Sequence, residues 1–243
     1  MSKEKSVRLD RLLSNLGYGS RKEMTMAVKN GWVDVDEERV HDPGFTVTPE
    51  MVRSGRVKLD GEILDPLPPL TLMMNKPAGV TSSHKDPGQV VYDLLPERFA
   101  RRNPKLAIAG RLDKDSTGLL ILTDDGELLH RITHPRRHAS KLYRVELRDP
   151  LRGDEAAIFG SGTMMLGAEE KPLKPANWQQ EGEKIGVMVL EEGRYRQIRR
   201  MFQTIGNEVV TLNRFQIGKL VLNDLEAGAW RTLTPQEISQ LTE

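Results

Sequence analysis

Apolar residues near the start of the chain recur at the spacing of a helix. The first set is Leu9, Leu12, Leu13 and Leu16. A second set follows at Met24, Ala27 and Val28. Glycines close both sets, and Ser20 and Glu23 stand before the second at the spacing of a capping box. The pattern predicts two short helices joined as a hairpin.

Alternating apolar residues then replace the helical spacing. Residues 32–35 alternate as a strand, and Val57 and Leu59 precede Asp60-Gly61, a dipeptide that favours a tight hairpin turn. Three prolines within residues 65–69 make that segment stiff and poor in hydrogen-bond donors, as in a linker. We therefore expect a small first domain over residues 1–66, with a linker to about residue 70.

The remainder of the chain, residues 71–243, consists of short apolar runs separated by turn signals and short helices. The runs that indicate strands are residues 72–74, 119–123, 142–147 and 185–190. They predict a second domain with a mainly antiparallel mixed sheet flanked by helices and loops. The fold class of the whole chain is accordingly α+β.

Composition narrows the class of protein. A chain of 243 residues is long enough for one ordinary domain and a small appended module. The absence of cysteine excludes a disulfide framework and thiolate metal or redox chemistry. Since no apolar run approaches the length that crosses a bilayer, we expect a cytoplasmic protein without a membrane partner.

The net charge of +1 does not by itself indicate a nucleic-acid partner, but the basic residues are unevenly distributed. They cluster at residues 98–102, 131–148 and 194–200. A single cluster is usually a solvated face, whereas three clusters around one candidate site favour a surface that binds a polyanion.

A basic helix start near the beginning of the chain resembles a known RNA-binding module. Arg21 and Lys22 fall in the first turn of the second helix, where free amides and the helix dipole attract phosphate. Together with residues 7–13 and 30–33, they resemble the S4 RNA-binding module. The alternative is a small α+β domain with ordinary surface charges. The resemblance implies RNA contacts from Arg8, Arg11, Arg21 and Lys22.

The loop of residues 110–118 contains the candidate catalytic residue, Asp113. It is polar, bounded by Gly110 and Gly118, and it leads directly into the apolar residues 119–122. A loop fixed by a buried neighbouring strand is a common place for functional side chains. Taken alone, an aspartate in such a loop is more often a turn or capping residue.

A predicted helix later in the chain offers a counter-charge for an aspartate. Its buried face consists of Ile198, Met201, Phe202 and Ile205, and Gly206 follows as a stop. Arg199 lies on the flank of this face. There it either neutralises a half-buried aspartate or extends to water, and the sequence leaves both open.

Four ordered segments resemble the signatures of one family. They are residues 74–80, 110–126, 141–143 (Lys-Leu-Tyr) and 192–202. These segments are similar to those of the RsuA-type ribosomal RNA pseudouridine synthases, which have an S4 module ahead of a catalytic domain. The resemblance spans nearly the whole chain and implies conversion of a uridine in ribosomal RNA to pseudouridine.

The resemblance also implies roles for individual residues. Asp113 matches the catalytic aspartate, Tyr143 the tyrosine that packs on the target base, and Arg199 the basic residue paired with the aspartate. Arg111 and Lys76 match further substrate-binding positions, although a structural role at a strand end is favoured for Lys76. Asp115 is expected to cap the loop. Further RNA contacts are expected from Arg136, Arg137, Arg196 and Arg200.

The implied reaction determines which partners are needed. It is redox-neutral and needs no outside reactant, so no cofactor or metal is expected. His130, His134 and His138 have metal-like spacing, but Pro135 interrupts a helix there and the surroundings are strongly basic. The expected partner is ribosomal RNA or a pre-ribosomal particle, and we expect the chain to act as a monomer.

Two chemical routes fit Asp113. Cleavage of the bond between N1 of uracil and C1′ of ribose leaves positive character on the sugar, which a carboxylate stabilises or attacks. Alternatively, the carboxylate takes a proton from C2′ to give a glycal. The sequence does not choose between them.

Several alternatives remain open for the function. Residues 132–138 and 192–202 look closest to family members that act on 16S (small-subunit) ribosomal RNA, which we favour. Residues 114–116 and Arg196 resemble relatives that act on 23S (large-subunit) ribosomal RNA. Outside the family, the alternatives are a non-catalytic S4-type RNA-binding or ribosome-assembly protein and a glycoside hydrolase. The hydrolase would need a second carboxylate such as Asp124 or Asp125.

Overall fold

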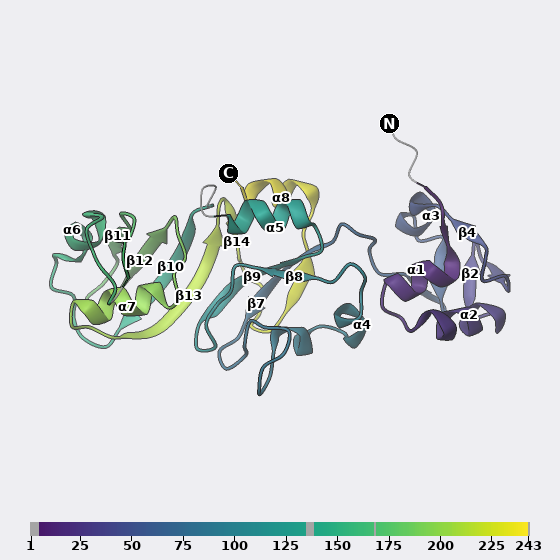
Figure 1. Ribbon diagram of the computed structural model, residues 1–243, viewed down its shortest axis with the longest axis horizontal. Helices are drawn as coiled ribbons and strands as arrows, with labels where there is room; N and C mark the ends of the chain where they lie inside the picture. The colour runs from purple at the N-terminus through teal and green to yellow at the C-terminus, as the bar shows by residue number, and fades with distance from the viewer. Residues whose placement is uncertain (1–4, 135–138, 168, 243) are drawn as a thin grey trace. The chain divides into compact units, whose positions relative to one another are not determined.

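The computed structural model describes residues 5–134, 139–167 and 169–242, and the chain forms two compact units (Figure 1). The first unit contains the chain up to Leu70 together with residues 95–107 and 123–125. The second unit contains residues 71–94, 108–122 and the chain from Gly126 onward. Two stretches that are remote in sequence therefore complete the first unit.

Short helices and strands build the first unit. Its helices are α1 (Leu9–Asn15), α2 (Arg21–Lys29), α3 (Pro49–Arg53) and α4 (Glu97–Ala100). An antiparallel sheet in the order β3-β2-β5-β6 consists of β2 (Val33–Val35), β3 (Glu38–Val40), β5 (Val57–Leu59) and β6 (Glu62–Ile63). A separate pair is formed by β1 (Val7–Arg8) and β4 (Thr46–Val47). The predicted helices and the hairpin at Asp60-Gly61 are confirmed.

The start of α2 shows why the sequence folds this way locally. The Ser20 hydroxyl accepts a hydrogen bond from the Glu23 amide, and the Glu23 carboxylate accepts one from the Ser20 amide, which completes the predicted capping box. The leucine stripe of α1 and the apolar stripe of α2 then meet in one buried cluster that also contains Val33 and Val57. Capping fixes where α2 begins, and burial of these stripes holds the helices on the sheet.

A nine-stranded mixed sheet dominates the second unit. Its main order is β11-β12-β10-β13-β9-β7-β15, with β14 on β13 and β8 on β9. The strands are β7 (Thr71–Lys76), β8 (Ala107–Ala109), β9 (Thr117–Thr123), β10 (Lys141–Leu147), β11 (Asn177–Gln180), β12 (Ile185–Leu190), β13 (Val209–Ile217), β14 (Leu220–Val221) and β15 (Trp230–Thr232). Neighbouring strands with a described register run antiparallel except β13 and β9, which are parallel. The predicted α+β class with a mainly antiparallel mixed sheet is confirmed.

Helices cover this sheet at separate places. They are η1 (Val91–Leu94, a 3₁₀ helix), α5 (Gly126–Thr133), α6 (Glu155–Gly160), α7 (Gln197–Thr204) and α8 (Pro235–Gln240). Helices α5 and α8 lie side by side (Figure 1), and Leu128, Ile132 and Leu241 share one buried cluster there. On α7, the Phe202 ring packs edge-on against Trp178, with ring centroids 5.2 Å apart. The apolar face predicted for α7 therefore holds that helix on the β10–β12 part of the sheet.

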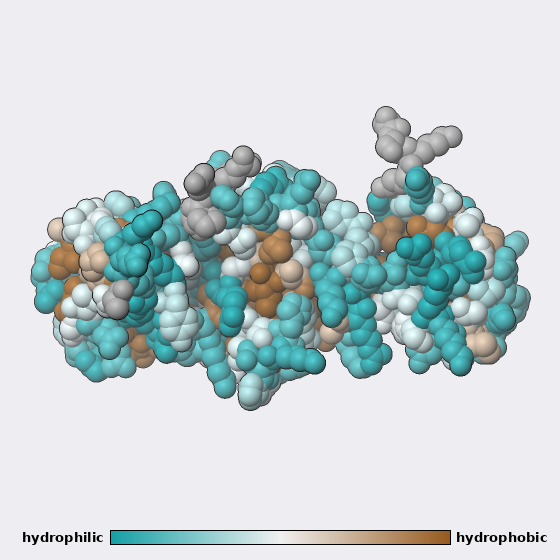
Figure 2. All heavy atoms as spheres, in the orientation of Figure 1, coloured by the Kyte–Doolittle hydropathy of each residue, from teal (hydrophilic) through white to brown (hydrophobic). Residues whose placement is uncertain are grey.

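Hydrophilic side chains cover most of the face drawn in Figure 2, and the hydrophobic ones form small separate patches. Within the described ranges, the helices are all too short or too polar to span a membrane.

Candidate functional site

The loop between β8 and β9, which contains Asp113, forms one wall of a pocket of about 660 Å³. The other walls come from β10, from β13 and from the turn that leads into α7. Four segments that are far apart in sequence therefore meet at the loop that the sequence singled out.

Asp113 lies half-buried in the pocket wall. Its backbone carbonyl accepts a hydrogen bond from the Ser116 amide at 3.1 Å, which tightens the loop into a turn. Its carboxylate receives no hydrogen bond or ion pair from the part of the chain that the structure describes. Both carboxylate oxygens therefore remain free to meet a bound molecule.

The expected pair between Arg199 and Asp113 is wrong. Arg199, on α7, instead forms an ion pair with Asp115, with 3.1 Å between Nη2 and Oδ2, and it donates to the Val209 carbonyl at 2.9 Å. Arg196 approaches the same carboxylate at 3.3 Å. Asp115 thus links the loop to α7 rather than only capping it. The two aspartates stand two positions apart, and the sequence alone does not show which of them faces the helix.

Lys76 fixes the backbone of this loop through hydrogen bonds. It is completely buried at the end of β7, and its ammonium group donates to the carbonyls of Pro77, Lys114 and Ser116 at 2.6–3.3 Å. Burial lowers the pKa of Lys76 to about 8, although Asp115 and Asp113 act in the opposite direction. The geometry gives Lys76 the positioning role at a strand end that the sequence favoured, because its three donors are engaged by backbone carbonyls.

Arg214 holds the same loop at its two ends. This buried arginine, on β13, donates through Nε to the Leu119 carbonyl and through Nη2 to the Gly110 carbonyl, both at 2.9 Å. A Cβ atom on Gly118 would lie 2.3 Å from the Arg214 carbonyl oxygen, so only glycine fits this close approach between β9 and β13. Arg214 and Lys76 together fix the backbone around Asp113.

Strand β10 contributes two side chains to the pocket. Lys141 and Tyr143 stand two positions apart, so they share one face of the strand, and both line the pocket while remaining almost completely buried. The Tyr143 ring therefore contributes to the pocket wall. Burial, followed by the charge of Arg214, lowers the pKa of Lys141 to about 8.

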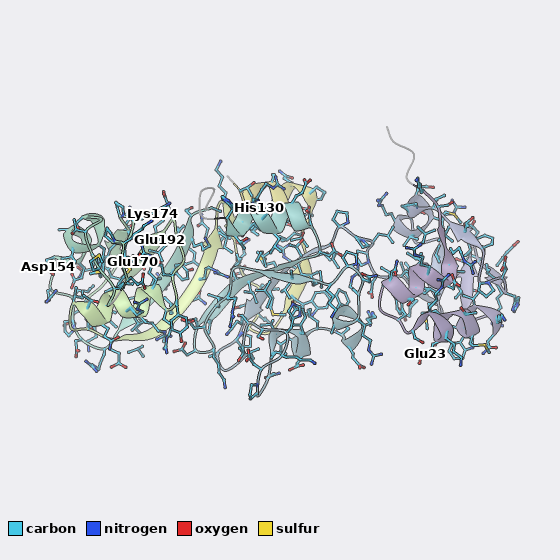
Figure 3. All side chains as sticks on the ribbon, in the orientation of Figure 1. Glu23, His130, Asp154, Glu170, Lys174 and Glu192 are labelled. Atoms are coloured by element: carbon cyan, nitrogen blue, oxygen red, sulfur yellow. The ribbon has the colours of Figure 1, made fainter. Side chains whose placement is uncertain are left out.

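The turn before α7 is rigidly held by an acidic residue. Glu192 accepts hydrogen bonds from the Lys174 amide and the Gln197 side chain, and Figure 3 shows Glu192 beside Lys174 at this end of the sheet. Arg196 then adopts a left-handed backbone conformation (φ 49°) at the helix start, which is a strained state for a residue with a side chain. This turn leaves Tyr195 with 77% of its surface exposed at the pocket edge.

The remaining predicted substrate and RNA contacts are distributed around this pocket. Arg111 is exposed and lines it, and Arg196 lines both this pocket and a neighbouring basic one of about 650 Å³. Arg200 lines the second pocket while pairing with Glu169. Arg136 and Arg137 lie outside the described residues, as does His138.

The basic side chains predicted to contact RNA in the first unit differ in whether an acidic residue pairs with them. Arg8 and Arg21 both form ion pairs with the buried Asp10, at 3.0 and 3.6 Å. Arg11 and Lys22 are exposed, and their side chains form no hydrogen bond or ion pair with the described part of the chain. Their charges are therefore the least compensated of the four.

The sequence patterns did not identify two of the site's buried cations. Lys141 belongs to the segment of residues 141–143 but no role was predicted for it, and none was predicted for Arg214. Lys141 occupies the buried phase of β10, which is otherwise apolar, and Arg214 is buried two positions after the buried Leu212 of β13. A basic residue in the apolar phase of a strand is the signal that would have identified them, because an unpaired buried charge is costly.

Comparisons with known proteins agree on the kind of chain this is. Residues 71–204 match the model of a family described as RNA pseudouridylate synthase, and residues 7–52 match that of the S4 domain. The chain is 38% identical over 241 residues to an uncharacterized RNA pseudouridine synthase, YtzG, of Bacillus subtilis, covering 98% of this chain and 99% of the relative. It is 37% identical over 237 residues to the ribosomal small subunit pseudouridine synthase A of Vibrio cholerae, covering 97% and 99%.

A solved structure supports the same assignment. A crystal structure of a pseudouridylate synthase superposes with a TM-score of 0.67 at 36% sequence identity, covering 97% of this chain and 100% of that one. The likeness therefore extends through both units of the chain.

Proposed function

The chain belongs to the RNA pseudouridylate synthase family, and on this premise we propose that it isomerises one uridine of 16S (small-subunit) ribosomal RNA to pseudouridine through Asp113. Family membership makes the chain an enzyme, which sets aside the non-catalytic RNA-binding alternative and the glycoside hydrolase. The choice of small-subunit RNA is supported by full-length relatives that are named as small-subunit enzymes.

The observation that supports the catalytic assignment is the unpaired carboxylate of Asp113 in the pocket wall. Either route for the reaction needs a carboxylate that is not engaged by the protein. In one route the carboxylate forms a bond to C1′ as N1 leaves, and in the other it removes a proton from C2′. Asp115, engaged by two arginines, meets this requirement poorly.

The surroundings of Asp113 fit a nucleotide that has left its RNA helix. A base inside folded RNA is unreachable, so the enzyme must extrude it and hold it by stacking. Tyr143 supplies an aromatic side chain in the pocket wall, and the exposed Arg111 and Arg196, which line the same pocket, are the side chains proposed to bind the flanking phosphates. The free carboxylate then lies near the sugar of the held nucleotide.

The role of Asp113 is tested by Asp113→Asn, with Asp115→Asn as the matched control. We expect Asp113→Asn to keep its thermal unfolding midpoint and RNA affinity but to release no tritium from RNA labelled at C5 of uridine. Asp115→Asn loses an ion pair but keeps the free carboxylate, so it should retain measurable release. Release by Asp113→Asn would show that another group performs the chemistry.

The choice of RNA is tested in cells. Pseudouridines are mapped in both ribosomal RNAs from cells that lack the protein, then from cells supplied with the wild-type chain or with Asp113→Asn. We expect one small-subunit position to lose its pseudouridine and to recover it with the wild-type chain alone. A missing position in the large-subunit RNA would establish the alternative target.

A further inference from the structure

Three basic side chains lie buried around the pocket, and they differ in how many of their donors the protein uses. Lys76 gives its ammonium to three backbone carbonyls. Arg214 gives two of its nitrogens to the ends of the loop. The Lys141 ammonium has one acceptor among the described residues, the Ala139 carbonyl at 3.3 Å. Of these three side chains, Lys141 forms the fewest hydrogen bonds, and two of its three N–H donors have no acceptor among the described residues.

The position of Lys141 makes this spare capacity significant. Only 6% of the residue is exposed, it lines the pocket, and it shares a strand face with Tyr143. Arg214 is close enough to act on it as a like charge. A buried ammonium that forms one hydrogen bond and has a cation nearby is destabilising. That one hydrogen bond does not offset the cost of burying the charge or the repulsion from Arg214. Such a site favours an anionic or strongly accepting ligand.

The proposed reaction supplies such a ligand. When the bond between C1′ and N1 breaks, its electron pair stays with the base, and the resulting uracil anion carries charge on N1 and on its carbonyl oxygens. Either the Asp113 carboxylate bonds to C1′ and is displaced from it when C5 bonds there, or it takes the proton from C2′ and returns it to C2′ as C5 bonds to C1′. After the base turns, C5 bonds to C1′, the C5 proton leaves, and N1 takes up a proton, so the sum is an isomerisation. The anion is the species that needs a nearby cation.

We infer that Lys141 is a catalytic residue that donates hydrogen bonds to a carbonyl oxygen of the target uracil and stabilises the uracil anion during cleavage. This rests on the proposed function. Fixed donors that meet developing charge in a dry site are among the strongest contributors to catalysis, and removing one typically lowers kcat by about 10²-fold or more. Lys141 suits the task because its strand, rather than a loop, fixes its position.

A contact with the RNA backbone explains Lys141 less well. The basic residues at the rim, Arg111 and Arg196, are exposed and available to phosphates that remain in solvent. Lys141 is almost completely buried in the pocket wall, on the same strand face as Tyr143. The base of an extruded nucleotide, rather than its phosphate, reaches that depth.

The test compares two substrates that differ in how well the base leaves. RNA containing uridine is set against the same RNA containing 5-fluorouridine at the target, because fluorine withdraws electrons and stabilises the anion without help from the protein. The measured quantity is the single-turnover rate constant at saturating enzyme for consumption of the target nucleoside. For Lys141→Met we expect a loss of about 10²-fold on uridine and a loss at least about tenfold smaller on 5-fluorouridine. Lys141→Arg, which retains a cation, should recover part of the uridine rate.

Lys114→Met is the matched control, because it removes an exposed lysine from the same pocket. It should slow both substrates by the same factor. Equal losses on the two substrates for a Lys141→Met protein of unchanged thermal midpoint would overturn the assignment, as would a loss confined to RNA affinity. If Lys141→Met unfolds, the comparison is made with Lys141→Gln and Lys141→Arg. A wild-type chain that forms no pseudouridine would instead refute the proposed function, so the two failures are distinguishable.

Discussion

Two aspartates of the loop between β8 and β9 have opposite surroundings although they stand two positions apart. Asp115 is fixed by Arg199 and Arg196, whereas the Asp113 carboxylate is free within the described part of the chain. The arginines of α7 therefore attach the loop to the helix without occupying the group proposed to act. The sequence predicted that Arg199 would meet an aspartate, but it contained no information on which one, because the choice depends on how the loop turns.

A double-mutant cycle tests this pairing. We expect Arg199→Met and Asp115→Asn to be coupled by about 0.2–1 kcal/mol in the free energy of unfolding, as is usual for a pair with one exposed partner. Arg199→Met and Asp113→Asn should be additive. Urea unfolding of the four proteins in each cycle, at low salt, provides the measurement. Coupling to Asp113 with none to Asp115 would restore the pairing first expected.

At the scale of elements, the patterns that predict structure are those that act locally. The capping box of α2, the apolar face of α7 and the apolar runs of β10 and β12 were all readable, since each depends on residues a few positions apart. The parallel pairing of β13 with β9 was not, because it joins residues nearly a hundred positions apart. The hydrogen bonds from Arg214 to the Gly110 and Leu119 carbonyls depend on that pairing, so the sequence did not predict them either.

Helix α8 provides a test of a local element. Hydrogen bonds from Arg231, and then from the Thr234 amide, lower the pKa of Glu237 to about 2. The folded pKa lies below the ordinary 4.5, so the stabilisation is complete above about pH 4.5 and is lost as the pH falls toward 2. We expect Glu237→Gln to lower the free energy of unfolding by about 2 kcal/mol at pH 7 and to have a smaller effect at pH 2.5.

The measurement is urea unfolding at several pH values between 2.5 and 7. Glu226→Gln is the control, because Glu226 is exposed and its side chain has no hydrogen bond or ion pair within the described ranges. An effect of Glu237→Gln that stays constant with pH would mean that the carboxylate is not held by Arg231 and the helix cap in solution.

At the scale of the whole molecule, segments remote in sequence complete each unit. In the first unit, Arg98 pairs with Asp65, Arg102 donates to the Pro66 carbonyl, and the Asn103 amide donates to the Asn15 carbonyl. The proline-rich segment indicates a linker, but no periodic pattern marks residues 95–107 as partners of the chain before it. Contacts of this kind depend on the assembled fold.

The distribution of charge leads to a prediction for RNA binding by the full chain. Near the start of the chain, Asp10 compensates Arg8 and Arg21, whereas Arg11 and Lys22 remain uncompensated. Binding to RNA releases about one counterion for each phosphate that a basic residue neutralises, so the affinity falls with salt in proportion to the number of such contacts. The uncompensated pair should therefore contribute most of the salt dependence that arises from this module.

We expect the double variant Arg11→Gln, Lys22→Gln to bind its RNA more weakly and to lower the slope of log affinity against log salt by about 1.5–2. Filter binding or fluorescence anisotropy between roughly 50 and 300 mM salt gives the slope. The control is Lys171→Gln, Lys174→Gln, which removes two exposed charges that line neither pocket. Equal slopes for the two double variants would place the RNA contacts of the first unit elsewhere. A reduced slope with an unchanged single-turnover rate constant would separate RNA binding by this unit from the catalysis proposed for Asp113.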